Sequence, residues 1–354
     1  MFIIYSILIF CLLIFVHEFG HLISAKLCKV RVNEFALGMG PKLFSRQKGE
    51  TLYSLRAIPI GGFCAMEGEN EESDDPNSFS SKPAWMKALV LVAGSLMNII
   101  LAIVLVAAII YYIGQPLSVV ETVAEDAPAA VAGLQSGDKI TAIGDTQIDE
   151  WGDISATLSS ELSSASPGGE IFSGEPGAAT DFHVTLTVER AGQEQKIETS
   201  LYYNEEGNVM IGITPAMGHS PVYFFKSFGL GTRTVFQMTG MMYSALWDLV
   251  TGKTGLDGLS GPIGIVKTVG DSVQYGFSSI VQLTALISLN LGIINLLPFP
   301  ALDGGRLLFL VIRKVAGKRI SDAVEAKVHL IGIILLLALM VVVTFKDVDR
   351  FILN

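Results

Sequence analysis

Residues 2–25 read FIIYSILIFCLLIFVHEFGHLISA, an apolar stretch that carries two histidines and a glutamate near its end. A helix needs about 20 apolar residues to cross a bilayer, so this stretch predicts a membrane span. It lacks the basic start and the small-residue cleavage site of a signal peptide, and we expect it to be retained. Ionisable residues inside a span are costly unless they serve a function. We therefore expect this helix both to span the membrane and to carry residues of the functional site.

Three further apolar stretches are long enough to span a bilayer. They lie at about 88–113, within 280–315, where Pro298 and Pro300 interrupt the helix, and at about 328–345. Half of the residues are hydrophobic and 16% are charged, whereas soluble domains carry about 25% charged residues. The sequence therefore predicts a polytopic α-helical membrane protein with four transmembrane helices. A net charge of −10 argues against nucleic acid as a partner.

Basic residues are distributed unevenly between the connecting segments. Residues 26–87 contain nine Lys or Arg, whereas residues 114–220 contain three against 17 acidic residues. Cytoplasmic segments are enriched in Lys and Arg. We therefore expect 26–87 and 316–327 to be cytoplasmic, and both termini and 114–275 to be extracytoplasmic. Lys346 and Arg350 run against this pattern.

The segments between the spans show β-like patterning. Apolar runs broken by glycine predict membrane-associated β-hairpins in 30–68, and short β-like runs between Gly turns predict a soluble α+β domain. A Ser-, Gly- and Pro-rich stretch at 159–180 predicts a loop insertion in that domain. The expected division is a first membrane half, a soluble domain, an amphipathic helix with a Gly-rich linker, and a second membrane half: 1–113, 114–217, 218–275 and 276–354.

The sequence His17-Glu18-Phe19-Gly20-His21 is the strongest chemical signal. Positions i and i+4 share a helix face, so His17 and His21 can bind one Zn²⁺ with Glu18 as general base. The alternative is a buried polar cluster that only holds helices together. Hydrolytic zinc sites generally use three protein ligands.

Asp303 is the candidate for the third ligand, because it is the only acidic residue in the third apolar stretch. It lies in NLLPFPALDGG, residues 295–305, where the prolines break the helix. Its alternative role is to cap the resumed helix. Asn290 and Asn295 precede it, and each could form an interhelical hydrogen bond or bind substrate backbone near the metal.

Taken together, HEFGH in the first span, one outer domain and NLGIINLLPFPALDGG at 290–305 resemble the site-2 protease family, peptidase M50. The likeness is greatest to its regulator of sigma-E protease type. The resemblance implies that His17, His21 and Asp303 bind zinc and that Glu18 is the catalytic base. It also implies that Asn290 binds substrate. Gly61, Gly62 and Phe63 would belong to a membrane-re-entrant β-hairpin that presents an edge strand to the substrate.

Residues 132–145, AGLQSGDKITAIGD, resemble the turn and strand of a PDZ domain. The family resemblance implies an intramembrane zinc endopeptidase of a bacterial plasma membrane. Its expected substrates are single-span membrane proteins, such as anti-sigma factors already cut by another protease or signal-peptide remnants. The alternative is a catalytically inactive, membrane-anchored PDZ adaptor. A metal transporter is disfavoured, because the second and fourth spans contain few polar residues.

Overall fold

A computed structural model describes residues 2–69, 73–124, 127–165, 179–203, 209–218, 224–253, 260–316 and 322–350. The chain divides into two compact units. The first joins Met1–Ile109 to Phe224–Asn354, and the second comprises Ile110–Tyr223. The histidines and Asp303 all lie in the first unit.

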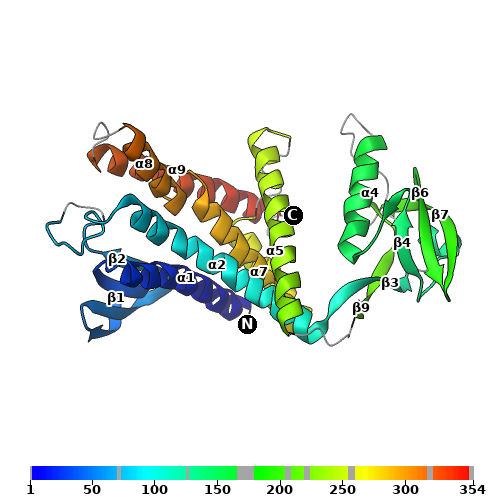
Figure 1. Ribbon diagram of the computed structural model, residues 1–354, viewed down its shortest axis with the longest axis horizontal. Helices are drawn as coiled ribbons and strands as arrows, with labels where there is room; N and C mark the ends of the chain where they lie inside the picture. The colour runs from blue at the N-terminus through cyan, green and yellow to red at the C-terminus, as the bar shows by residue number, and fades with distance from the viewer. Residues whose placement is uncertain are drawn as a thin grey trace. The chain divides into compact units, whose positions relative to one another are not determined.

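The first unit contains helices long and apolar enough to cross a membrane. Within the described residues there are four: α1 (Phe2–Leu27), α2 (Ala84–Ile113), α7 (Phe277–Leu296) and α9 (Asp322–Val348, apolar from Val324) (Figure 1). The prediction of four helices with the length and composition of membrane spans is confirmed. Many of their apolar side chains are exposed, as expected for helices whose solvent is lipid.

The third apolar stretch folds as two helices separated by a loop. Helix α7 ends at Leu296, and α8 (Asp303–Ala316) begins at the predicted metal ligand. Pro298 and Pro300 lie in the intervening loop, where their missing N–H groups cost no helical hydrogen bond. A Cβ on Gly305 would lie 2.2 Å from the carbonyl oxygen of Phe299, so only glycine lets the chain double back this tightly.

Between α1 and α2 the chain forms two long antiparallel strands, β1 (Val32–Lys48) and β2 (Thr51–Met66). Both strands bend, so that residues 32–37 pair with 62–66 on one side and with 52–55 on the other. Residues 42–48 then pair with 51–56. Among the described residues, 62–66 pair only with 32–37, so this segment forms one edge of the sheet.

Two further helices complete the first unit. Helix α5 (Phe224–Val250) packs Val235 against Ala102 and Leu289 of the spans. Residues 262–274, expected in a linker, form helix α6 (Pro262–Gln274) instead. Pro at the first helical position favours this start, and the Asp347 carboxylate accepts hydrogen bonds from the N–H groups of Gly261 and Gly264. Residues 254–259 of the Gly-rich segment lie outside the described part.

In its described residues, the second unit combines an antiparallel sheet with two helices. Its strands are β3 (Gln115–Val123), β4 (Lys139–Ile143), β5 (Thr146–Gln147), β6 (Ala179–Arg190), β7 (Gln193–Tyr203), β8 (Val209–Met210) and β9 (Ile213–Gly218). The sheet order is β8-β7-β6-β4-β3-β9, with β5 beside β4. Helices α3 (Pro128–Val131) and α4 (Trp151–Ala165) contribute Ala129 and Ile154 to its core. Part of the expected 159–180 loop is therefore helix and strand, and 166–178 lies outside the described residues.

An ion pair on the buried carboxylate of Asp138 fixes the turn before β4. Arg190 donates two hydrogen bonds of 2.6 Å to the Asp138 carboxylate, and the Gln135 N–H donates a third of 2.9 Å. Burial by itself raises the pKa of Asp138, but these hydrogen bonds outweigh it and hold the pKa below its usual value.

Candidate metal centre

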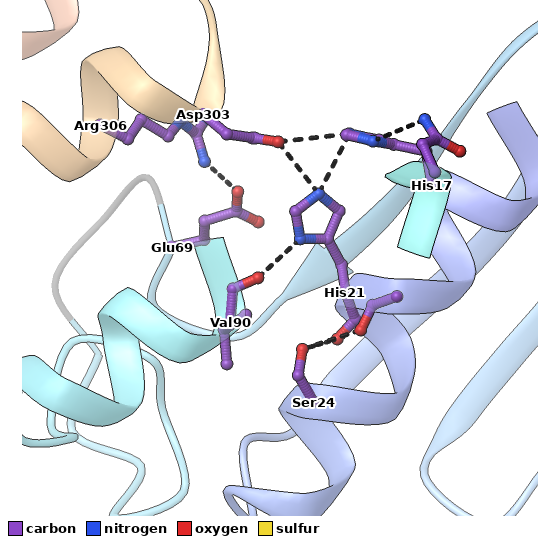
Figure 2. Close-up of polar contacts among 9 residues, drawn as sticks. His17, His21, Ser24, Glu69, Val90, Asp303 and Arg306 are labelled. Carbon is purple, nitrogen blue, oxygen red and sulfur yellow. Dashed lines mark hydrogen bonds and ion pairs between the residues drawn. The ribbon is translucent and has the colours of Figure 1, made fainter. Parts of the chain in front are cut away.

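Helices α1 and α8 bring His17, His21 and Asp303 together, although 282 residues of sequence separate His21 from Asp303. Asp303 Oδ2 lies 3.2 Å from His17 Nε2 and 3.4 Å from His21 Nε2. The two Nε2 atoms are 3.3 Å apart. Figure 2 shows the carboxylate and both rings converging on one point.

This triangle fits a tetrahedral zinc ion. Ligand bonds of about 2.0–2.1 Å at tetrahedral angles place ligand atoms about 3.3 Å apart, and all three separations agree with that value. Asp303 Oδ2 is also buried without a hydrogen-bond donor among the described residues. When both imidazoles carry their proton on Nδ1, three lone pairs face one another and a cation between them removes the repulsion, so the donor set suits zinc.

Each ring has a polar partner in α2 on the side away from the other donor atoms. His21 Nδ1 lies 2.8 Å from the carbonyl oxygen of Val90 in α2, so it must donate, which leaves Nε2 free to bind a metal. His17 Nδ1 lies 3.4 Å from Nδ2 of Asn98, a side chain fully buried in α2. The amide oxygen and nitrogen exchange places when the side chain turns by 180°, and with Oδ1 toward the ring Asn98 accepts from Nδ1 and leaves His17 Nε2 free for a metal. Asn98 was missed in the sequence, although a polar residue within a span was a usable signal.

Glycine lets α2 approach the two histidines. A Cβ on Gly94 would lie 2.3 Å from His21 Nε2 and 2.9 Å from His17 Cε1. Gly20 has the reciprocal role in α1, because its Cβ would lie 2.4 Å from the carbonyl oxygen of Ala93. Sequence reasoning used neither glycine, since only the packed structure shows which atoms face them.

Glu18 lies beside the edge strand of the hairpin. A Cβ on Gly62 would lie 3.4 Å from Glu18 Cγ and 3.1 Å from Ile14 Cγ2, and both of these side chains belong to helix α1. The Glu18 carboxyl interacts electrostatically with both histidines and with Asp303. The expected catalytic base and the expected substrate-binding hairpin therefore lie next to each other.

The remaining hairpin residues have structural contacts of their own. Gly61 adopts a positive φ of 88°, a conformation that favours glycine. The guanidinium of Arg56 lies over the ring of Phe63, 4.8 Å from its centre. These contacts shape the end of the edge strand.

Asn290 and Asn295 both lie on α7, and neither belongs to the group formed by His17, His21 and Asp303. Asn290 is exposed and Asn295 is half-buried. Neither forms a side-chain hydrogen bond among the described residues. An exposed amide on an apolar helix is consistent with a surface that receives a polar ligand, and substrate binding stays a prediction for both.

An ion pair links the loop before α2 to the helix that carries Asp303. Arg306, one turn after Asp303, pairs with the Glu69 carboxylate (Figure 2). Both residues line a cavity of about 450 Å³, together with His329 and Lys87. This cavity was not predicted, because its lining comes from four separate segments.

Comparison with known proteins agrees with this geometry. The sequence profile of Peptidase family M50 matches residues 5–339. A protein of Clostridium acetobutylicum is 36% identical over 347 residues, which cover 98% of this chain and 97% of the relative. One of Fusobacterium nucleatum is 35% identical over 348 residues, 95% of each chain. One of Staphylococcus aureus is 32% identical over 440 aligned positions, 98% of each chain.

The names of all three relatives class them among the zinc metalloproteases. The profile and the relatives extend over nearly the whole chain, and its apolar helices are those of a multi-pass membrane protein. The chain therefore belongs to peptidase family M50, the site-2 proteases, whose members are metalloproteases that use zinc.

Proposed function

We propose that this protein is an intramembrane zinc endopeptidase that cleaves the transmembrane segments of single-span membrane proteins. The observation that carries the proposal is the position of the donor triangle. His17 and His21 lie within the membrane-spanning helix α1, and Glu18 adjoins an edge strand that could hold a peptide. A soluble substrate would not require a site at this depth.

His17, His21 and Asp303 would hold the zinc ion. When bound, zinc supplies a Lewis acid and lowers the pKa of a coordinated water to about 7. Glu18 accepts a proton from the attacking water and delivers it to the nitrogen of the departing fragment. The 450 Å³ cavity lined by Glu69 and Arg306 would admit water beside the helix that carries Asp303, from the side that we assign to the cytoplasm.

The hairpin edge would bind the substrate. Peptide bonds of a transmembrane helix are tied in i→i−4 hydrogen bonds, so the helix must unwind before it is cut. Pairing with the free edge at 62–66 replaces those bonds and holds the peptide extended beside Glu18. Asn290, exposed on α7, would bind the substrate backbone from another side.

The second unit would act as a PDZ-like domain outside the cell. Its strand β4 and the Asp138 turn lie in the segment that resembles a PDZ signature. Most Lys and Arg flank the spans on the opposite side, which supports extracytoplasmic termini and an extracytoplasmic domain. Substrates shortened outside by another protease, such as anti-sigma factors, and signal-peptide remnants fit this arrangement.

The competing function is a membrane-anchored PDZ adaptor without activity. The complete donor triangle and the adjacent Glu18 argue against it, because an adaptor needs neither.

The test is cleavage of a tagged single-span substrate by the purified protein in detergent, with Glu18→Gln run in parallel. Cleavage by the wild type and none by a zinc-loaded Glu18→Gln supports the proposal. Equal turnover by the variant removes Glu18 as base. A wild type that binds no zinc and cleaves nothing supports the adaptor.

A further inference from the structure

We propose that His329 of helix α9 is a positioning residue for the metal centre, which acts by fixing the loop that presents Asp303. This inference rests on the proposed zinc ligands and adds a fourth helix to their support. His329 touches no donor atom of the metal group. It acts through the backbone two residues before Asp303.

The contact is a hydrogen bond between the loop and the ring. The backbone N–H of Ala301 donates to His329 Nδ1 at 2.8 Å. An imidazole that accepts at Nδ1 must carry its proton on Nε2, which fixes the tautomer. His329 Nε2 lies 3.8 Å from Glu325 Oε1, too far for a hydrogen bond, so the bond to Ala301 is the ring's polar contact among the described residues.

The loop needs this support because its backbone is strained. Ala301 adopts a φ of +84°, which a residue with a Cβ rarely adopts. Such a conformation is unfavourable and persists only where surrounding contacts hold it. Without its acceptor, the N–H of Ala301 would lose the contact that holds this conformation; the loop would relax, and Asp303 would move with it.

Helix α9 is shaped to reach this loop. A Cβ on Gly332 would lie 2.4 Å from the carbonyl oxygen of Pro300, so glycine permits the close approach. Gly332 lies three residues after His329, on the same helix face. The ring of Phe309 in α8 lies 5.5 Å from the His329 ring and confines its rotation. The imidazole is therefore held from two helices and aimed at Ala301.

The experiment compares two substitutions of equal size and different chemistry. In His329→Asn the side-chain oxygen takes the place of Nδ1 and still accepts from Ala301, whereas His329→Leu removes the acceptor. Leu330→Ala, a change at an exposed neighbour on α9, serves as the matched control. Full-length proteins are equilibrated with graded chelator, and retained zinc is measured by elemental analysis.

We expect His329→Leu to hold zinc at least about tenfold more weakly than the wild type, the size of effect seen when supporting partners of ligands are removed. His329→Asn should retain most of the affinity, and Leu330→Ala should match the wild type. Cobalt replaces zinc for a second readout. The visible spectrum should change in His329→Leu and not in His329→Asn, because it reports coordination geometry and not stability.

The outcomes separate this inference from the proposed function. If the wild type holds zinc and His329→Leu shows the same zinc affinity and the same cobalt spectrum, the role of His329 is overturned and the metal centre is not. Equal losses in the Asn and Leu variants also overturn it, because they would show that ring packing and not the hydrogen bond matters. A wild type without zinc overturns the metal centre itself.

Discussion

Replacing Gly94 with alanine tests the metal centre through a residue that binds nothing. The added Cβ would lie 2.3 Å from His21 Nε2, whereas ordinary contact begins at 3.4 Å, a deficit of about 1.1 Å. Zinc–ligand distances vary by only about 0.2 Å. Because α2 also contacts Gly20 closely, the strain falls on the imidazole, and the His21 ligand bond is lost.

We therefore expect Gly94→Ala to weaken zinc binding at least about 100-fold, or about 2.7 kcal/mol. Zinc content after equilibration with graded chelator measures this in the full-length protein. Gly240→Ala is the matched control, because nothing lies within 4 Å of its added Cβ in helix α5. Size-exclusion chromatography checks that both variants fold. A Gly94→Ala protein that folds and binds zinc as tightly as the control would refute the ligand geometry.

Three further predictions concern the supports of the site and of the second unit. Asn98→Leu should weaken zinc binding about tenfold in the same chelator titration, because His17 Nδ1 loses its polar partner in α2. Asn98→Asp, whose carboxylate accepts a proton from His17 Nδ1, should not weaken it, and equal losses in the two variants would contradict this reasoning. Phe63→Pro should slow cleavage without loss of zinc, since proline removes a hydrogen-bond donor from the edge strand. Zinc content and cleavage rate are measured on the same protein, and an unchanged rate would exclude strand pairing at this position. Because the pKa of Asp138 is lowered by folding, its contribution to stability is complete above the unfolded value of about 3.9 and is lost as the pH falls through the folded value. The measurement is the protection of β4 amides against hydrogen exchange in the full chain, relative to unfolded exchange rates. In the wild type this protection should fall as the pH is lowered, whereas in Asp138→Asn it should be weaker and independent of pH. Parallel pH profiles of the two proteins would contradict the prediction.

The spans, the zinc motif and the third-ligand candidate could all be predicted from the sequence. A membrane helix satisfies its own backbone hydrogen bonds, so about 20 apolar residues suffice to identify it without knowledge of its neighbours. The pair His17 and His21 is also local, since helix geometry alone places positions i and i+4 on one face. Asp303 stood out because a carboxylate in an apolar stretch is rare.

The hairpin and helix α6 were predicted less completely. Several short β segments were expected in 30–68, and the structure joins them into two bent strands whose pairing leaves 62–66 at an edge. That register depends on contacts with α1, which the local pattern does not contain. Helix α6 was missed because its start is stabilised by Asp347, 83 residues after Gly264.

Only the tertiary structure showed what holds the ligands in place. Gly94 and Asn98 matter because α2 crosses α1 at the histidines, and His329 matters because α9 reaches the loop before Asp303. The sequence by itself determined the membrane spans, the chemistry of the donors and the family, since these depend on composition and short spacing. The approach of helices far apart in the chain determined the rest, because steric fit and buried hydrogen bonds depend on which atoms meet.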